Sequence, residues 1–123
     1  MNIIYSDGGT RGSRICMYDK QLEKFIVKHR YSPNSRSTPL TNNELEYLAL
    51  IYCIEYSNNV YSKKKVQIKV DSLLVANQIN GKWRVTTEHL IPLYEKCMRL
   101  LTDNISVSWI SRDFNLAGHV LES

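Results

Sequence analysis

The chain has 123 residues, enough for one hydrophobic core and too few for two, so residues 1–123 are predicted to form a single domain. Hydrophobic residues make up 43% of the sequence and charged residues 23%, a balance typical of soluble globular proteins. The formal net charge of +4 is a weak indication of a polyanionic partner. No apolar run reaches about 18 residues and no leader peptide precedes the first strand, so a cytoplasmic protein without membrane association is expected.

The first third of the sequence predicts an antiparallel meander. Residues 2–7 are an apolar run that ends at Asp7, and the glycines that follow it turn the chain. Residues 13–20 and 24–31 have the composition of two further strands joined by a short turn. Residues 32–40 are rich in serine and proline and are expected to form a loop.

The rest of the sequence predicts helices that alternate with strands. The strongest helix spans 41–57, where Thr41 and Glu44 fit a capping box and the following residues are apolar on all sides, so this helix should be buried. The later elements are a strand at 66–70, helices at 72–80 and 88–102, a strand at 105–110 and a short helix at 113–122. This order predicts an α/β fold with a mixed five-stranded sheet, three antiparallel strands followed by two parallel ones, flanked by helices.

Three acidic residues occupy positions at which this fold could bring them together. Asp7 ends the first strand and Asp71 follows the strand at 66–70, so the two become neighbours if these strands pair in parallel. Glu46 interrupts the apolar helix, where a lone ionised carboxylate would be unstable. Divalent cations relieve the repulsion between clustered carboxylates, and oxygen ligands favour magnesium or manganese.

Each acid also has a simpler interpretation. Asp7 precedes a glycine and could form a turn, and Asp71 stands beside Ser72 and could cap the next helix. Glu44 is explained by the capping box alone. Glu46 has no such explanation unless it reaches a polar surface, so the combination of the three acids carries the metal hypothesis.

Four stretches of the sequence resemble one family in the same order along the chain. They are IIYSDGG (3–9), TNNELEYLAL (41–50), IKVDSLLVANQINGKW (68–83) and VSWISRDFNLAGHVLE (107–122). Together they resemble the motifs of type 1 ribonuclease H over nearly the whole chain. The resemblance places the acids of the family's first three motifs at Asp7, Glu46 and Asp71.

The resemblance implies a metal-dependent endonuclease that cleaves the RNA strand of RNA–DNA hybrids and leaves 5′-phosphomonoesters. Two ions, Mg²⁺ or Mn²⁺, would lie about 4 Å apart, one activating a water and the other stabilising the leaving oxygen. Asp7 would bridge both ions, and Glu46 and Asp71 would hold the ion on the leaving-group side. No obligatory protein partner is expected. Two other functions stay open, a non-catalytic binding domain and another nuclease on the same fold, such as a resolvase or exonuclease.

The resemblance also implies contacts with the substrate. Five residues are assigned to substrate binding on their motif positions: Gly8, Thr41, Asn42, Asn43 and Asn115. The polar residues at 41–43 would sense the RNA 2′-hydroxyl groups, although capping of the helix start explains them equally well. Five basic residues are candidates for phosphate contacts: Lys63, Lys64, Lys65, Lys82 and Arg84. For the three consecutive lysines, a solvated loop is the slightly favoured interpretation. Trp83 is expected to seal the core rather than to stack on the substrate.

The last motif departs from the family because its fourth acid is missing. With Asn115 aligned to the family's asparagine, Gly118 falls at an alanine and His119 at the final aspartate. His119 could replace the acid as a ligand, Glu122 could reach the site from the same helix face, or the site could bind without cleaving. Because imidazole suits softer ions than magnesium, a preference for Mn²⁺ is expected if His119 is a ligand.

Overall fold

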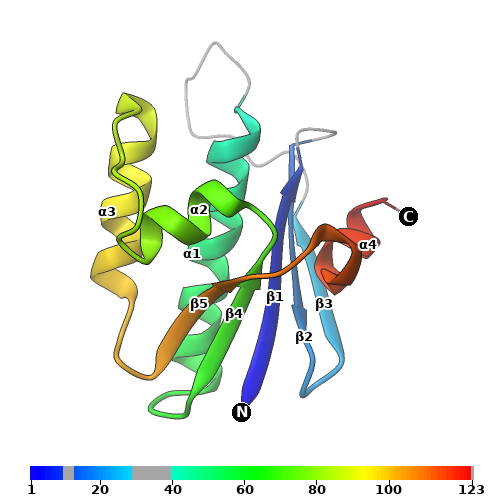
Figure 1. The fold of residues 1–123 in the computed structure, drawn as a ribbon. Helices are drawn as coiled ribbons and strands as arrows, with labels where there is room; N and C mark the ends of the chain where they lie inside the picture. Colours follow the sequence, from blue (N-terminus) through cyan, green and yellow to red (C-terminus); the bar gives the residue numbers. More distant parts are fainter. Residues whose placement is uncertain (10–12, 29–39, 123) are drawn as a thin grey trace.

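The sheet formed by the described residues has five strands in the order β3-β2-β1-β4-β5 (Figure 1). The computed structural model describes residues 1–9, 13–28 and 40–122, with side chains described as far as residue 119. The strands are β1 (Asn2–Gly9), β2 (Arg14–Asp19), β3 (Lys24–Lys28), β4 (Val66–Val70) and β5 (Ile105–Trp109). The first three pair antiparallel, whereas β4 pairs parallel with both β1 and β5. The predicted mixed sheet is therefore confirmed.

Helices cover both faces of this sheet (Figure 1). The helices are α1 (Asn42–Val60), α2 (Leu73–Ile79), α3 (Ile91–Leu100) and α4 (Leu116–Glu122), with the short 3₁₀ turns η1 (Glu88–Leu90) and η2 (Arg112–Phe114) before the last two. Neighbouring strand residues point to opposite faces. Accordingly, Ile4 packs in the core with α1 and α3, whereas Tyr5 packs with Ala117 of α4. None of the helices in the described parts of the chain is long and apolar enough to cross a membrane.

The capping box predicted at the start of α1 is present. The Thr41 hydroxyl accepts the Glu44 backbone N–H at 3.2 Å, and the Glu44 carboxylate accepts the Thr41 backbone N–H at 2.9 Å. The helix ends at Val60, three residues beyond the prediction. The Ser57 hydroxyl donates to the Cys53 carbonyl at 2.7 Å, so this polar residue is satisfied within the helix and does not end it.

The boundaries of other elements differ from the predictions by a few residues. Residues 29–31, predicted as the end of a strand, and most of the predicted loop at 32–40 lie outside the described residues. The predicted helices at 88–102 and 113–122 each begin as a 3₁₀ turn. Pro92 in the first turn of α3 has no backbone N–H and suits a helix start, which explains the division at that point.

The register between β1 and β4 places Asp7 next to Asp71. The parallel pairs run from Asn2 with Val66 to Ser6 with Val70, so the two aspartates are the next residues on the two strands. The sequence predicted that β1 ends at Asp7. Instead β1 continues to Gly9 because its antiparallel pairing with β2 extends to that residue. Asp7 therefore lies inside a strand, at the point where the parallel pairing ends.

Candidate metal centre

Three carboxylates from separate parts of the chain meet at this edge of the sheet. One carboxylate oxygen from each of Asp7, Glu46 and Asp71 lies within 4.8 Å of the other two. Asp7 comes from β1, Asp71 directly follows β4, and Glu46 comes from the first turns of α1. The expectation that these acids converge is thus met, and their oxygen donors suit a hard divalent cation.

A glycine brings Glu46 close to Asp7. A Cβ atom on Gly8 would lie 2.3 Å from the Leu45 carbonyl oxygen and 2.7 Å from the Glu46 nitrogen, so only glycine allows α1 to approach β1 this closely. The Gly8 N–H then donates to the Glu46 carboxyl group at 2.9 Å. Gly8 was also predicted to contact substrate. In this structure Gly8 is buried and its N–H is used by Glu46, and contact with substrate stays a prediction.

Asn115 holds Asp71 in place. Its side-chain amide donates to the Ser6 carbonyl at 2.9 Å and to an Asp71 carboxylate oxygen at 3.0 Å, and its own oxygen accepts the Ala117 N–H at 3.1 Å. Asn115 was also predicted to contact substrate. Its side chain is 0% exposed and makes these three hydrogen bonds, so in this structure it positions Asp71, and its contact with substrate stays a prediction.

The electrostatics of the centre favour an added positive charge. Burial raises the pKa of Glu46 to about 10, helped by its hydrogen bond with Asp7 and by the negative charges of Asp7 and Asp71. Burial also raises the pKa of Asp7 to about 6, and the hydrogen bond from Glu46 and the charge of Arg112 offset only part of that rise. Without a cation, the pair therefore keeps a proton on Glu46 that Asp7 accepts. A divalent cation can replace that proton, so the residues fit a metal ion.

Of the two candidates for the missing fourth acid, only His119 has a described side chain. His119 is exposed, and its ring Nε2 lies 3.0 Å from the Asp113 carbonyl oxygen, to which it donates when it carries the proton. Among the described side chains, the group contains the three carboxylates and not His119. The side chain of Glu122 lies outside the described part, so its role stays a prediction.

The polar residues at the start of α1 differ in their surroundings. Thr41 is the N-cap residue, which confirms the simpler interpretation of this side chain. Asn42 is exposed and Asn43 is half-buried, so contact between these two residues and a substrate stays a prediction.

A groove beside the connection between α2 and α3 contains several residues that the sequence assigned to the core or to phosphates. It has a volume of about 600 Å³ and is lined by Lys82, Trp83, Arg84, Tyr94 and Glu95, among others. Trp83 is 47% exposed, so the prediction that it seals the core is wrong. The connection folds back on α2 through hydrogen bonds from the Lys82 and Trp83 backbones to the Asn77 carbonyl, and this leaves the indole at the surface.

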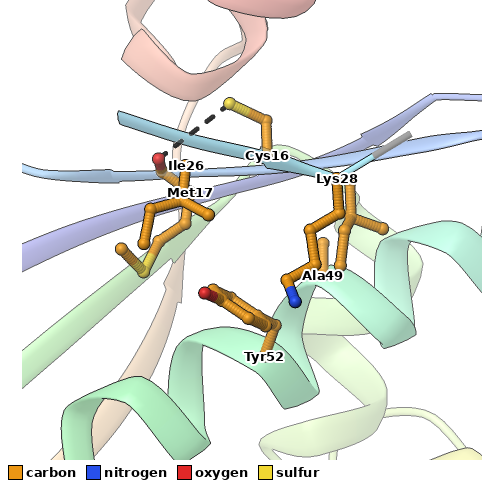
Figure 2. Close-up of a pocket in the computed structure, with 7 residues that line it drawn as sticks. Cys16, Met17, Ile26, Lys28, Ala49 and Tyr52 are labelled. Carbon is orange, nitrogen blue, oxygen red and sulfur yellow. Dashed lines mark hydrogen bonds between the residues drawn. The ribbon is translucent and has the colours of Figure 1, made fainter. Parts of the chain in front are cut away.

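A narrow hollow between α1 and the strands β2 and β3 plays no part in the metal centre (Figure 2). Its walls are mainly apolar, with the Lys28 amine 5.0 Å from the centre of the Tyr52 ring. The hollow is too narrow to admit a water molecule, and the described residues that line it include no carboxylate.

The fold and the acid cluster define a ribonuclease H-like protein. The family described as Reverse transcriptase-like matches residues 23–121, and the chain belongs to this family. The protein is also 37% identical over 82 residues to the uncharacterized protein YpeP of Bacillus subtilis (strain 168), a match that covers 66% of this chain and 29% of YpeP. The chain thus spans less than a third of that relative.

Solved structures show the same fold. RNase H1 from the halophilic archaeon Halobacterium salinarum NRC-1 has a TM-score of 0.74 at 22% identity, covering 98% of this chain and 92% of that one. LC11-RNase H1, isolated from compost by a metagenomic approach, has a TM-score of 0.77 at 26% identity, covering 98% and 91%. LC11-RNase H1 in complex with an RNA/DNA hybrid has a TM-score of 0.77 at 24% identity, covering 98% and 93%.

Proposed function

We propose that the protein is an endonuclease that uses divalent metal ions to cleave the RNA strand of RNA–DNA hybrids. The observation that carries this proposal is the meeting of Asp7, Glu46 and Asp71 within 4.8 Å at the end of the parallel strands. A structure similar in fold, LC11-RNase H1, is known in complex with an RNA/DNA hybrid, which supports the substrate class.

The three acids would hold two ions, Mg²⁺ or Mn²⁺. When bound, such ions generate a nucleophilic hydroxide and stabilise the charge that develops on the leaving oxygen. Asp7 interacts with both other acids, through a hydrogen bond with Glu46 and the charge of Asp71, so its central position suits a bridging ligand. Gly8 and Asn115 restrict the movement of Glu46 and Asp71, which preorganises the site before substrate binds.

Substrate recognition is assigned to polar residues at the start of α1 and to basic residues beside the groove. Asn42 and Asn43 lie at the start of the helix that carries Glu46, where their amides could hydrogen-bond 2′-hydroxyl groups of the RNA strand. Lys82 and Arg84 are exposed beside the groove that contains Trp83, and their charges suit phosphate contacts. Affinity for the hybrid should therefore fall as salt concentration rises.

The fourth ligand and the choice of metal form a finer part of the proposal. His119 occupies the motif position of the missing acid, and an imidazole ligand would favour Mn²⁺ over Mg²⁺. For His119 to act as that ligand, its ring would have to leave the Asp113 carbonyl. Activity of His119→Ala in the two metals tests this role. Unchanged activity and unchanged metal preference would show that His119 is not a ligand and would leave Glu122 as the candidate.

A cleavage assay tests the proposed function. Purified protein is incubated with a labelled RNA–DNA hybrid and Mg²⁺ or Mn²⁺, alongside DNA duplex, junction and single-stranded substrates. We expect cleavage of the RNA strand of the hybrid, and Asp7→Asn should abolish it. Asp103→Asn, which changes an exposed acid in the connection between α3 and β5, is the matched control and should cleave normally. An intact hybrid with both metals, or cleavage of another substrate alone, contradicts the proposal.

A second candidate function is a domain that binds hybrids without cleaving them. The observation that favours it is that His119 stands at the motif position of the fourth acid and that its ring is hydrogen-bonded to the Asp113 carbonyl oxygen. Binding measured by fluorescence anisotropy separates the two functions. Salt-sensitive binding to the hybrid with no cleavage in either metal would support the binding domain and exclude the nuclease.

A further inference from the structure

The helix α4 touches the metal centre at Gly118. This residue is buried, and α4 packs on the outer face of β1 and β2. A Cβ atom on Gly118 would lie 3.0 Å from the Oδ2 atom of Asp7 and 3.7 Å from the Oδ2 atom of Asp71. The first distance is shorter than the usual contact between a carbon and an oxygen atom. The helix backbone therefore lies directly against two of the three acids, with no side chain between them.

Contacts on the N-terminal side of Gly118 fix the helix in this place. Asn115 binds the Ser6 carbonyl and the Asp71 carboxylate at the start of α4. Ala117 is 0% exposed and packs against Tyr5 and Cys16. Movement of α4 away from Asp7 would break the hydrogen bonds and open the apolar contact. The contacts of Asn115 and Ala117 therefore hold Gly118 close to Asp7.

Glycine lowers the stability of a helix, so its presence at position 118 needs an explanation. Glycine is about 1 kcal/mol less favourable than alanine in a helix interior. The φ angle of Gly118 is not in the left-handed region, so backbone conformation does not require glycine here. What distinguishes the position is the short distance to the Asp7 carboxylate.

We propose that Gly118 is a positioning residue of the metal centre, an inference that rests on the proposed metal-dependent function. A side chain at this position forces one of two movements. Either the Asp7 carboxylate rotates away from Glu46 and Asp71, or α4 moves outward and withdraws Asn115 from Asp71. Both movements weaken the ligand set, and both grow with the size of the side chain.

Metal binding by two variants of different size tests this role. Mn²⁺ binding is measured by calorimetry for the wild type, Gly118→Ala and Gly118→Val. Residues that orient metal ligands commonly affect affinity by about 10- to 100-fold, so we expect a loss near the lower limit for alanine and near the upper limit for valine. Met98→Val, at an exposed position of α3, is the control for placing valine in a helix and should bind Mn²⁺ like the wild type.

A second measurement needs no metal. Hydrogen exchange of the Asn115 side-chain amide is followed by NMR in the metal-free protein, where its two hydrogen bonds should make exchange slow. We expect faster exchange in Gly118→Val if the helix moves outward. Affinity and exchange that both match the wild type in the two variants overturn the inference.

The two measurements also separate this inference from the proposed function. A wild type that binds no Mn²⁺ contradicts the metal-dependent function. In that case the test of Gly118 depends on hydrogen exchange of the Asn115 side-chain amide alone. An exchange rate in Gly118→Val equal to that of the wild type overturns the inference. If Gly118→Val does not fold, Gly118→Ala decides the result, because alanine favours the helical conformation.

Discussion

Two buried acid sites in this protein show opposite ways of keeping a carboxylate inside a fold. Asp19, at the end of β2, is 0% exposed and accepts hydrogen bonds from the hydroxyl groups of Tyr56 and Tyr61 at 2.7 Å, and from the backbone of Gln21 and Leu22 at 3.0 and 3.3 Å. Both oxygens of the carboxylate therefore accept hydrogen bonds. The site is complete without any ion, so it is structural.

The metal centre differs from this site because three acids lie close together. Glu46 receives the Gly8 N–H and Asp71 receives the Asn115 amide, but the three carboxylates also face one another. The raised pKa values of Asp7 and Glu46 report this mutual cost and the cost of burial. The comparison teaches that burial of an acid alone does not indicate function. A group of buried acids that repel one another is a better indication, because a bound cation can neutralise their charge.

Removal of Asp19 should have the largest effect on stability and little effect on the metal centre. Asp19→Ala leaves the hydroxyl groups of buried Tyr61 and half-buried Tyr56 without their acceptor, and we expect a loss of about 3 kcal/mol in the free energy of unfolding. Urea unfolding measures the loss, and calorimetry should show Mn²⁺ affinity within about twofold of the wild type. Asp103→Ala, at an exposed acid, is the control. A large loss of Mn²⁺ affinity in folded Asp19→Ala would contradict the separation of the two sites.

The affinity of the metal centre for Mn²⁺ should increase with pH. The proton on Glu46 must leave when the ion binds, and the pKa of Glu46, raised to about 10 by burial, lies above the working range. We expect affinity to rise by about tenfold per pH unit between about pH 6.5 and 8.5, with about one proton released per ion bound. Calorimetry in buffers of different ionisation enthalpy counts these protons. A constant affinity over this range would show that Glu46 is already ionised.

Neutralising Glu46 should stabilise the metal-free protein, the reverse of the effect at Asp19. The pKa values of Glu46 and Asp7 rise from 4.5 and 3.8 to about 10 and about 6, chiefly through burial, so the folded protein binds more protons than the unfolded chain. Wild-type stability should therefore fall as pH rises above about 4. Glu46→Gln keeps a donor toward Asp7 and an acceptor for Gly8, and should be more stable by about 1–2 kcal/mol at pH 8.

Urea unfolding in EDTA at pH 5 and pH 8 measures this difference. The gain from Glu46→Gln should be larger at pH 8 than at pH 5. Glu55→Gln, at an exposed position of the same helix, should change stability little at either pH. A Glu46→Gln protein that is less stable than the wild type at pH 8 would show that the carboxylate is satisfied in the folded state, as Asp19 is.

The smallest effect is expected at Thr41, which caps the helix that connects the two sites. Thr41→Ala removes the acceptor of the Glu44 N–H and should cost about 1 kcal/mol of stability. Thr41→Ser keeps a hydroxyl group and should recover most of this loss. If Thr41 only caps the helix, both variants cleave the hybrid like the wild type at a temperature where they are folded. A selective loss of hybrid cleavage in Thr41→Ala would instead assign Thr41 to substrate binding.

The local features of this protein follow well from its sequence. The capping box of Thr41 and Glu44, the β-branched strand after it and the order of elements all depend on neighbouring residues. The proximity of Asp7 and Asp71 could also be predicted from the sequence. It requires only that two strands, each with an acid near its end, pair in parallel.

The long-range contacts could not be predicted from the sequence in the same way. The hydrogen bond from the Asn115 amide to the Ser6 carbonyl joins residues 109 positions apart, and no neighbouring residue in the sequence of either one indicates it. Gly8 also looked like a turn glycine, but the neighbouring helix is what requires it. The exposure of Trp83 depends on how its loop folds back on α2. In each case the deciding partner is distant along the chain.

The register of β1 against β4 has a consequence for how this protein tolerates length changes. Residues at odd positions of β1, such as Tyr5 and Asp7, face α4, whereas Ile4 and Gly8 face α1. Deletion of one residue before Asp7 would exchange these two sets, turn the aspartate toward the hydrophobic interior and bring a side chain against α1. Substitutions at the start of β1 should therefore be tolerated more readily than insertions or deletions there.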